Sequence, residues 1–201
     1  TLFAPRTNET HPEPEVLQQM IHSVNRAPDD SILEEANRYF DVEKLLLHLA
    51  VENYVGEVDG LLGSEGMNNF YLYRPNGSER FTIIAWDKDV AFSLVEHPLF
   101  YNIESNVLTR RLFESPQIRR MYLDALQRVA ETAGGTDGWL STELEKAVRQ
   151  ISSIVPQDTN WPGRFDDFLG ASEIVRFVVQ ERAAWVLSEI TAIEAAAREQ
   201  Q

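Results

Sequence analysis

The sequence contains no cysteine, which excludes a disulfide framework and a cysteine-ligated zinc site. Its four histidines are dispersed and do not show the spacing of metal ligands. There is no Gly-rich P-loop, and no Ser or His has the setting of a nucleophilic triad.

Basic residues are scarce, because 18 Lys and Arg stand against 32 Asp and Glu, for a net charge of -14. This balance argues against sequence-independent binding of DNA or RNA, which requires many Lys and Arg contacts to phosphates. It argues equally against a polybasic membrane contact. An acidic surface suits a basic protein substrate, and it serves solubility equally well.

Long apolar runs are also missing. No stretch approaches the roughly 20 apolar residues of a membrane-spanning helix, and we expect no signal peptide within these residues. The chain opens at Thr1 rather than at Met. We therefore expect a processed or trimmed piece, from which a targeting signal could have been removed.

The composition is that of an ordinary globular protein, with 43% hydrophobic and 25% charged residues among 201. No internal repeat or low-complexity tract divides the chain. We expect a single domain over residues 1–201, with residues 1–14 and 195–201 flexible.

Apolar residues recur at helical spacing along much of the chain. The first predicted helix begins near Glu15, and a short one starts at Asp30 or Ser31 and runs through Tyr39. The next predicted helix is capped by Asp41 and stops before Gly56. The other predicted helices span residues 104–114, 116–133, 138–154 and 171–199.

Two β-rich runs, Phe70 to Tyr73 and Arg80 to Trp86, flank a turn containing Asn76-Gly77. Asn-Gly tolerates positive φ at both positions, which predicts a β-hairpin. Trp86 is expected in the core. The predicted fold class is therefore α+β, predominantly α-helical, with one β-hairpin.

Acids and amides flank this hairpin. Asp59, Asn68 and Asn69 precede its first strand, while Asp87 and Asp89 follow its second. A hairpin brings these two ends together, so carboxylate and amide oxygens should meet at one point. Oxygen ligands of this kind suit Mg²⁺, which usually takes one or two carboxylates plus waters and phosphate oxygens.

Simpler interpretations of the same residues stay open. Asp87 and Asp89 could cap a turn, at least one of Asn68 and Asn69 could be a turn residue, and Asp59 could be a solvated acid. Against these stands the order of parts, Asp then Asn then hairpin then Asp, which is also the order in protein kinases.

Three motifs resemble the CotH kinase family of atypical protein kinases. They are FDVEKLLLHLAVENYVGEVDG, NNFYLY and FTIIAWDKDVAF, and the later LTRRLFESPQIRRMYLDAL and FVVQERAAWVLSEI fit the family's carboxyl-terminal helices. The resemblance covers most of the chain. One departure is Ala85, where the family has a proline before Trp-Asp.

The resemblance implies a protein-kinase-like carboxyl-terminal lobe and a role for each residue. Asp59 would be the catalytic Asp, Asn68 or Asn69 the metal-binding amide, Asp87 the metal-binding Asp of the nucleotide site, and Asp89 a further ligand. The implied cofactors are ATP and Mg²⁺ or Mn²⁺.

The implied activity is phosphoryl transfer to Ser or Thr of a protein substrate, possibly a basic or Ser-rich one, in the spore coat or outside the cell. No Gly-rich strand pair and no strand Lys precede Asp41. We therefore expect the amino-terminal nucleotide-binding lobe to be absent and this chain alone to be inactive. The alternative is a non-catalytic CotH-like coat or surface protein that acts in binding and assembly.

Overall fold

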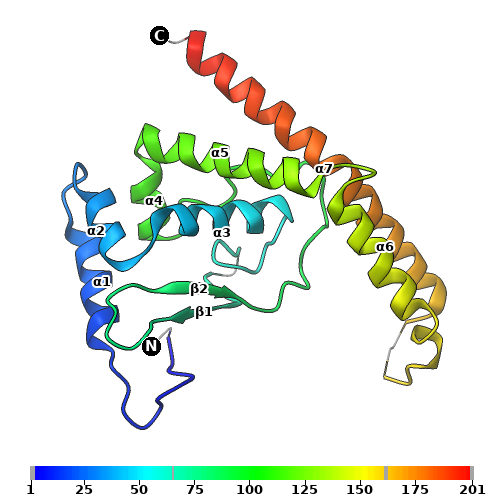
Figure 1. Cartoon of the computed structure of the whole chain (residues 1–201), viewed down its shortest axis with the longest axis horizontal. Helices are drawn as coiled ribbons and strands as arrows, with labels where there is room; N and C mark the ends of the chain where they lie inside the picture. The colour runs from blue at the N-terminus through cyan, green and yellow to red at the C-terminus, as the bar shows by residue number, and fades with distance from the viewer. Residues whose placement is uncertain (1–2, 65, 161–162, 200–201) are drawn as a thin grey trace.

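The computed structural model describes residues 3–64, 66–160 and 163–199. These residues form seven α-helices, one short 3-10 helix and one two-stranded antiparallel sheet (Figure 1). The helices are α1 (Glu15–Arg26), α2 (Ile32–Tyr39), α3 (Val42–Tyr54), α4 (Val107–Phe113), α5 (Pro116–Ala133), α6 (Trp139–Ser152) and α7 (Phe165–Glu199). The strands are β1 (Phe70–Tyr73) and β2 (Thr82–Ala85), and the 3-10 helix η1 is Val155–Gln157. The predicted α+β class, predominantly helical with one hairpin, is confirmed.

Helix α3 forms the centre of the core. Its first turn is capped by Asp41, whose carboxylate accepts a hydrogen bond from the Lys44 amide at 3.2 Å. Leu46 and Leu49 are almost completely buried. Gly56 follows the helix with φ of 67°, a left-handed conformation that favours glycine. The predicted cap and stop are both confirmed.

Helix α5 packs on α3, and α7 packs on α5 (Figure 1). Ile118, Tyr122 and Leu126, on the inner face of α5, have no exposed surface. The Tyr122 hydroxyl donates to the Leu99 carbonyl at 2.7 Å, so its one polar atom is satisfied inside the core.

The hairpin has one face on the core and one face outward. Its register pairs Phe70 with Ala85 and Tyr71 with Ile84. Phe70, on the inner face, packs against the core. The expectation that Trp86 is buried is wrong, because it is 57% exposed. Alternation along the strand places it on the outward face, where its ring lies 5.7 Å from that of Tyr71.

Helices α6 and α7 pair as an arm that projects from the body (Figure 1). Helix α7 begins at Phe165, earlier than the predicted residue 171, and it continues through Glu199.

Within the described ranges, no helix has both the length and the apolar character required to span a bilayer. The single-domain assignment and the flexible ends stay predictions, and residues 1–2 and 200–201 of those ends lie outside the described residues.

A buried arginine fastens α7 to the end of α3. Arg182 is 1% exposed and donates hydrogen bonds to the carbonyls of Asn53 and Tyr54, both at 3.0 Å. It also donates to the carbonyls of Val95 at 2.6 Å and His97 at 2.8 Å. Burial lowers the pKa of Arg182 to about 10, which still leaves it charged at neutral pH. These hydrogen bonds hold the end of α3 in place, and with it the start of the loop that follows.

Candidate functional site

The loop between α3 and β1 folds back on itself. The Asn68 amide donates to the Gly60 carbonyl at 3.1 Å, and the Ser64 amide donates to the Val58 carbonyl at 3.0 Å. The loop also reaches the turn after β2, because the Val58 amide lies 3.4 Å from the Val90 carbonyl. Segments from before and after the hairpin thus share one end of it.

Asp59 is bonded to both predicted amide residues. Its Oδ1 accepts from Asn68 Nδ2 at 3.1 Å, and its Oδ2 accepts from Asn69 Nδ2 at 2.8 Å. The structure therefore brings these three residues together. Because each asparagine donates through its nitrogen, each amide oxygen is left for another ligand.

Asp87 lies just beyond the last paired residues of the hairpin. The Trp86 amide donates to the Asn69 carbonyl at 3.1 Å, which extends the pairing by one position toward the acids. Asn69 and Asp87 both have left-handed backbones, with φ of 48° and 49°. Asn and Asp adopt this conformation more readily than most residues, and it clusters at functional sites.

The carboxylates of Asp87 and Asp89 are exposed to solvent. In the part of the chain that the structure describes, neither accepts a hydrogen bond from the turn, so the turn-capping interpretation has no support there. Exposure leaves both carboxylates accessible to a ligand.

A buried acid that the sequence did not suggest orients Asp59. Glu57 is 3% exposed, and its Oε1 accepts a hydrogen bond from the Asp59 amide at 2.7 Å. Burial raises the pKa of the Glu57 carboxyl. Its other oxygen, Oε2, is buried with no hydrogen-bond partner among the described residues.

A second buried acid, Glu52, bridges the loop and the turn. Its side chain is 7% exposed, its Oε2 accepts from the Leu61 amide at 3.0 Å, and its Oε1 lies 2.5 Å from Lys88 Nζ. His48 Nε2 is 3.2 Å from Oε1 without the alignment of a hydrogen bond. Burial alone would raise the pKa of the Glu52 carboxyl. His48 and Lys88 favour its charged form more strongly, so the pKa is lowered overall.

Glu52 carried a signal in the sequence that was missed. It stands seven residues after Leu45 and three after Leu49 on the same face of the helix, and these two residues are buried. An acid on the apolar face of a helix is unusual, because Glu is almost never buried without a partner. Lys88, between Asp87 and Asp89, supplies that partner.

The donor set fits a metal that arrives with a nucleotide. Among the described residues, no group of three or more His, Asp or Glu converges as a metal site. Mg²⁺ bound to phosphates needs only one or two carboxylates from the protein, and the exposed Asp87 carboxylate and the asparagine oxygens are ligands of the kind that it takes.

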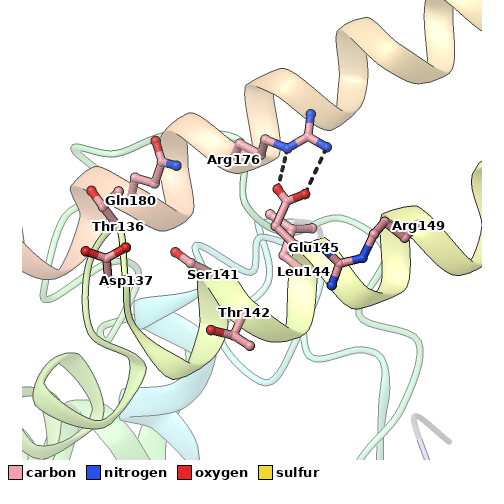
Figure 2. Close-up of a pocket in the computed structure, with 9 residues that line it drawn as sticks. All are labelled: Thr136, Asp137, Ser141, Thr142, Leu144, Glu145, Arg149, Arg176 and Gln180. Atoms are coloured by element: carbon pink, nitrogen blue, oxygen red, sulfur yellow. Dashed lines mark hydrogen bonds and ion pairs between the residues drawn. The ribbon is translucent and has the colours of Figure 1, made fainter.

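A polar pocket of about 280 Å³ lies elsewhere, between α6 and α7 (Figure 2). Across it, Arg176 pairs with Glu145 through hydrogen bonds of 2.5 and 3.4 Å. None of the acids and amides beside the hairpin lines this pocket. This ion pair joins two helices, and other polar residues in the lining, among them Asp137 and Gln180, add to the pocket's polar character.

Comparison with known proteins gives one family and one curated relative. The model of the family described as CotH kinase protein matches residues 3–186, which include all the site residues above. Inner spore coat protein H of Bacillus subtilis (strain 168) is 26% identical over 181 residues. The alignment covers 87% of this chain and 48% of the relative, so the chain spans about half the length of that relative.

Proposed function

The chain belongs to the CotH kinase family, and from this premise we propose that it is part of a protein kinase that requires ATP and a divalent metal. The reaction is transfer of the terminal phosphoryl group of ATP to a Ser or Thr hydroxyl of a protein. The observation that carries the proposal is the bonding of Asp59 to Asn68 and Asn69 beside the strand that leads to Asp87.

Each residue has a role set by its position. The two asparagines hold the Asp59 carboxylate by its two oxygens, so that it can orient an attacking hydroxyl and accept its proton. The Glu57 carboxylate holds the backbone of Asp59 by accepting a hydrogen bond from its amide. Asp87 and an asparagine oxygen would hold Mg²⁺ or Mn²⁺, with Asp89 as a further ligand, and a metal held there would neutralise charge on the phosphates.

The outward face of the hairpin adds an apolar surface beside these acids. Ile84 is 46% exposed and Trp86 57% exposed, and Tyr71 contacts the Trp86 ring edge to face. An exposed aromatic surface beside a phosphate site suits the base of a nucleotide. We expect the nucleotide-binding lobe implied by the resemblance to cover this face in the whole protein, and this chain alone to be inactive.

The substrate and location follow from charge and from the relative. A net charge of -14 favours a basic or Ser-rich protein substrate over an acidic one. The relative is described as an inner spore coat protein, so we propose the spore coat as the location. That description names a coat component rather than an enzyme, which favours a non-catalytic assembly role as the second candidate.

Ligand-dependent stability separates the two candidates. We expect millimolar Mg²⁺ or Mn²⁺ with ATP to raise the Tm of the full-length protein, because a ligand at 100 times its Kd stabilises the folded state by about 2.7 kcal/mol. Asp87→Asn should abolish the rise, while Asp124→Asn, on an exposed position of α5, should preserve it. An unchanged Tm at saturating metal and ATP would favour the assembly role.

A further inference from the structure

We propose that Glu52 is a positioning residue that couples the loop carrying Asp59 to the turn carrying Asp87. The coupling runs through two contacts of a single carboxylate, one to a backbone amide of the loop and one to the side chain of Lys88 in the turn. The chemical consequence of this coupling rests on the proposed phosphoryl transfer, whereas the coupling itself is a property of the fold.

The loop side of the contact is tight. Glu52 Oε2 accepts from the Leu61 amide at 3.0 Å, two residues after Asp59. Gly60 lies directly over the carboxylate, and a Cβ there would come within 2.7 Å of Oε1. Because the carboxylate is buried and held by partners on both sides, it cannot swing aside cheaply. Glycine at position 60 is what lets the loop close on Glu52.

The turn side of the contact is a charge pair. Lys88 Nζ lies 2.5 Å from Glu52 Oε1, with the Lys88 side chain 24% exposed. Lys88 is flanked by both candidate metal ligands, Asp87 and Asp89. Its side chain turns inward to Glu52, while the two carboxylates on either side of it stay exposed. Anchoring Lys88 therefore fixes the backbone from which both acids project.

The base of this bridge is rigid. Glu52 belongs to the last turn of α3, where Arg182 binds the neighbouring carbonyls of Asn53 and Tyr54. The Glu52 carbonyl itself accepts a hydrogen bond from the Glu57 amide at 2.9 Å, and Glu57 in turn holds the amide of Asp59. A displacement of the Glu52 carboxylate would therefore shift both Asp59 and Asp87.

Stability alone is a poor reason for this arrangement. Removing a carboxylate and an ammonium from water is costly, and replacing a buried ion pair by apolar side chains is often neutral or stabilising. The geometry that the pair fixes is the separation between Asp59 and Asp87. A misplacement of about 1 Å between reacting groups can reduce the rate on the order of 100-fold.

The first test measures hydrogen exchange in the full-length protein. Glu52→Gln and Lys88→Met should each speed exchange in both segments 58–64 and 86–90, and the double variant should add little to either. Exchange in α5 should be unchanged. The matched control is Glu145→Gln, which weakens the ion pair with Arg176 on the arm and should leave both segments unaltered.

Two results would overturn the coupling. One is faster exchange confined to 58–64 in Glu52→Gln and to 86–90 in Lys88→Met. The other is a double variant whose effects are the sum of the two single variants. If Glu52→Gln also loosens α5, the partly exposed Lys88→Met decides together with the double variant, because loosening that passed through the direct Val58–Val90 contact instead of Glu52 would add to the effect of Glu52→Gln.

The second test separates positioning from binding. In the full-length protein, Lys88→Met and Glu52→Gln should lower kcat on the order of 10- to 100-fold with little change in KM for the protein substrate. Glu145→Gln should change neither. An unchanged kcat would contradict positioning. A wild-type protein that transfers no phosphate would remove the proposed function, while the exchange result would still decide the coupling.

Discussion

Two glutamates with ion-pair partners, Glu52 and Glu145, have opposite settings in this molecule. Glu52 has a side chain 7% exposed and binds both Lys88 and a backbone amide of the loop. Glu145 has a side chain 40% exposed and joins α6 to α7 through Arg176 (Figure 2). The first pair is kept despite the cost of burial, at the point where two chain segments meet beside Asp59. The second lies at a surface where water screens it.

The same contrast occurs within one helix. Arg182 of α7 is buried against four carbonyls, whereas Arg176, two turns earlier, pairs with acids at the edge of the arm. Buried charged residues thus lie where the loop that carries Asp59 begins, whereas the α6–α7 arm carries its charges at the surface. We infer that the start of this loop requires a fixed geometry and that the charges of the arm serve to pair its two helices.

The largest expected effect is on Arg182. Arg182→Met should lower the free energy of unfolding by about 4 kcal/mol, because it leaves the carbonyls of Asn53 and Tyr54, among others, without a donor in the core. Urea denaturation measures this loss. Arg176→Met is the matched change on the arm and should have a much smaller effect. Equal losses in the two variants would contradict the contrast between the buried and the exposed arginine.

Glu52→Ala should be next, with a loss of about 3 kcal/mol. The variant leaves Lys88 without its partner and the Leu61 amide without an acceptor. Urea denaturation beside Glu145→Ala tests the contrast between the two pairs directly. A Glu52→Ala protein as stable as wild type would show that the buried pair is not needed to hold the loop.

A smaller effect is expected from pH. Burial lowers the pKa of His97 from 6.5 to about 4, so the unfolded chain binds a proton at this residue more readily than the folded chain. Stability from His97 is therefore fully present above pH 6.5 and is lost as pH falls toward 4, by about 2 kcal/mol. The difference between wild-type and His97→Gln stability curves isolates this residue. A constant difference across that range would contradict the assignment.

Much of the fold was readable because local signals agreed. The Asp41 cap, the stop at Gly56 and the Asn76-Gly77 turn each act within a few residues, and all lie where they were predicted. The start of α7 at Phe165 was missed because its first turns contain Gly170, a poor helix former, and are mostly exposed, so no buried apolar stripe marks them in the sequence.

The site was only half readable. The hairpin predicted that Asp59, Asn68 and Asn69 would lie near the end of the second strand, and the structure places them there. The roles of Glu52 and Lys88 depend on burial and on a contact across 36 positions of sequence. Charged residues in a sequence are normally predicted to face solvent. For this reason the burial of Glu52 and its contact with Lys88 were not predicted.

Phosphoryl transfer by the full-length protein most directly tests the proposed roles of Asp59 and of the site beside the hairpin. The measurement is incorporation of labelled terminal phosphate from ATP into a basic or Ser-rich protein with Mg²⁺ or Mn²⁺, for wild type, Asp59→Asn and Asp124→Asn. We expect transfer by wild type and Asp124→Asn, and a loss of at least about 100-fold in Asp59→Asn. Transfer that persists in Asp59→Asn would contradict the role of this carboxylate, and no transfer by wild type would contradict the kinase proposal itself.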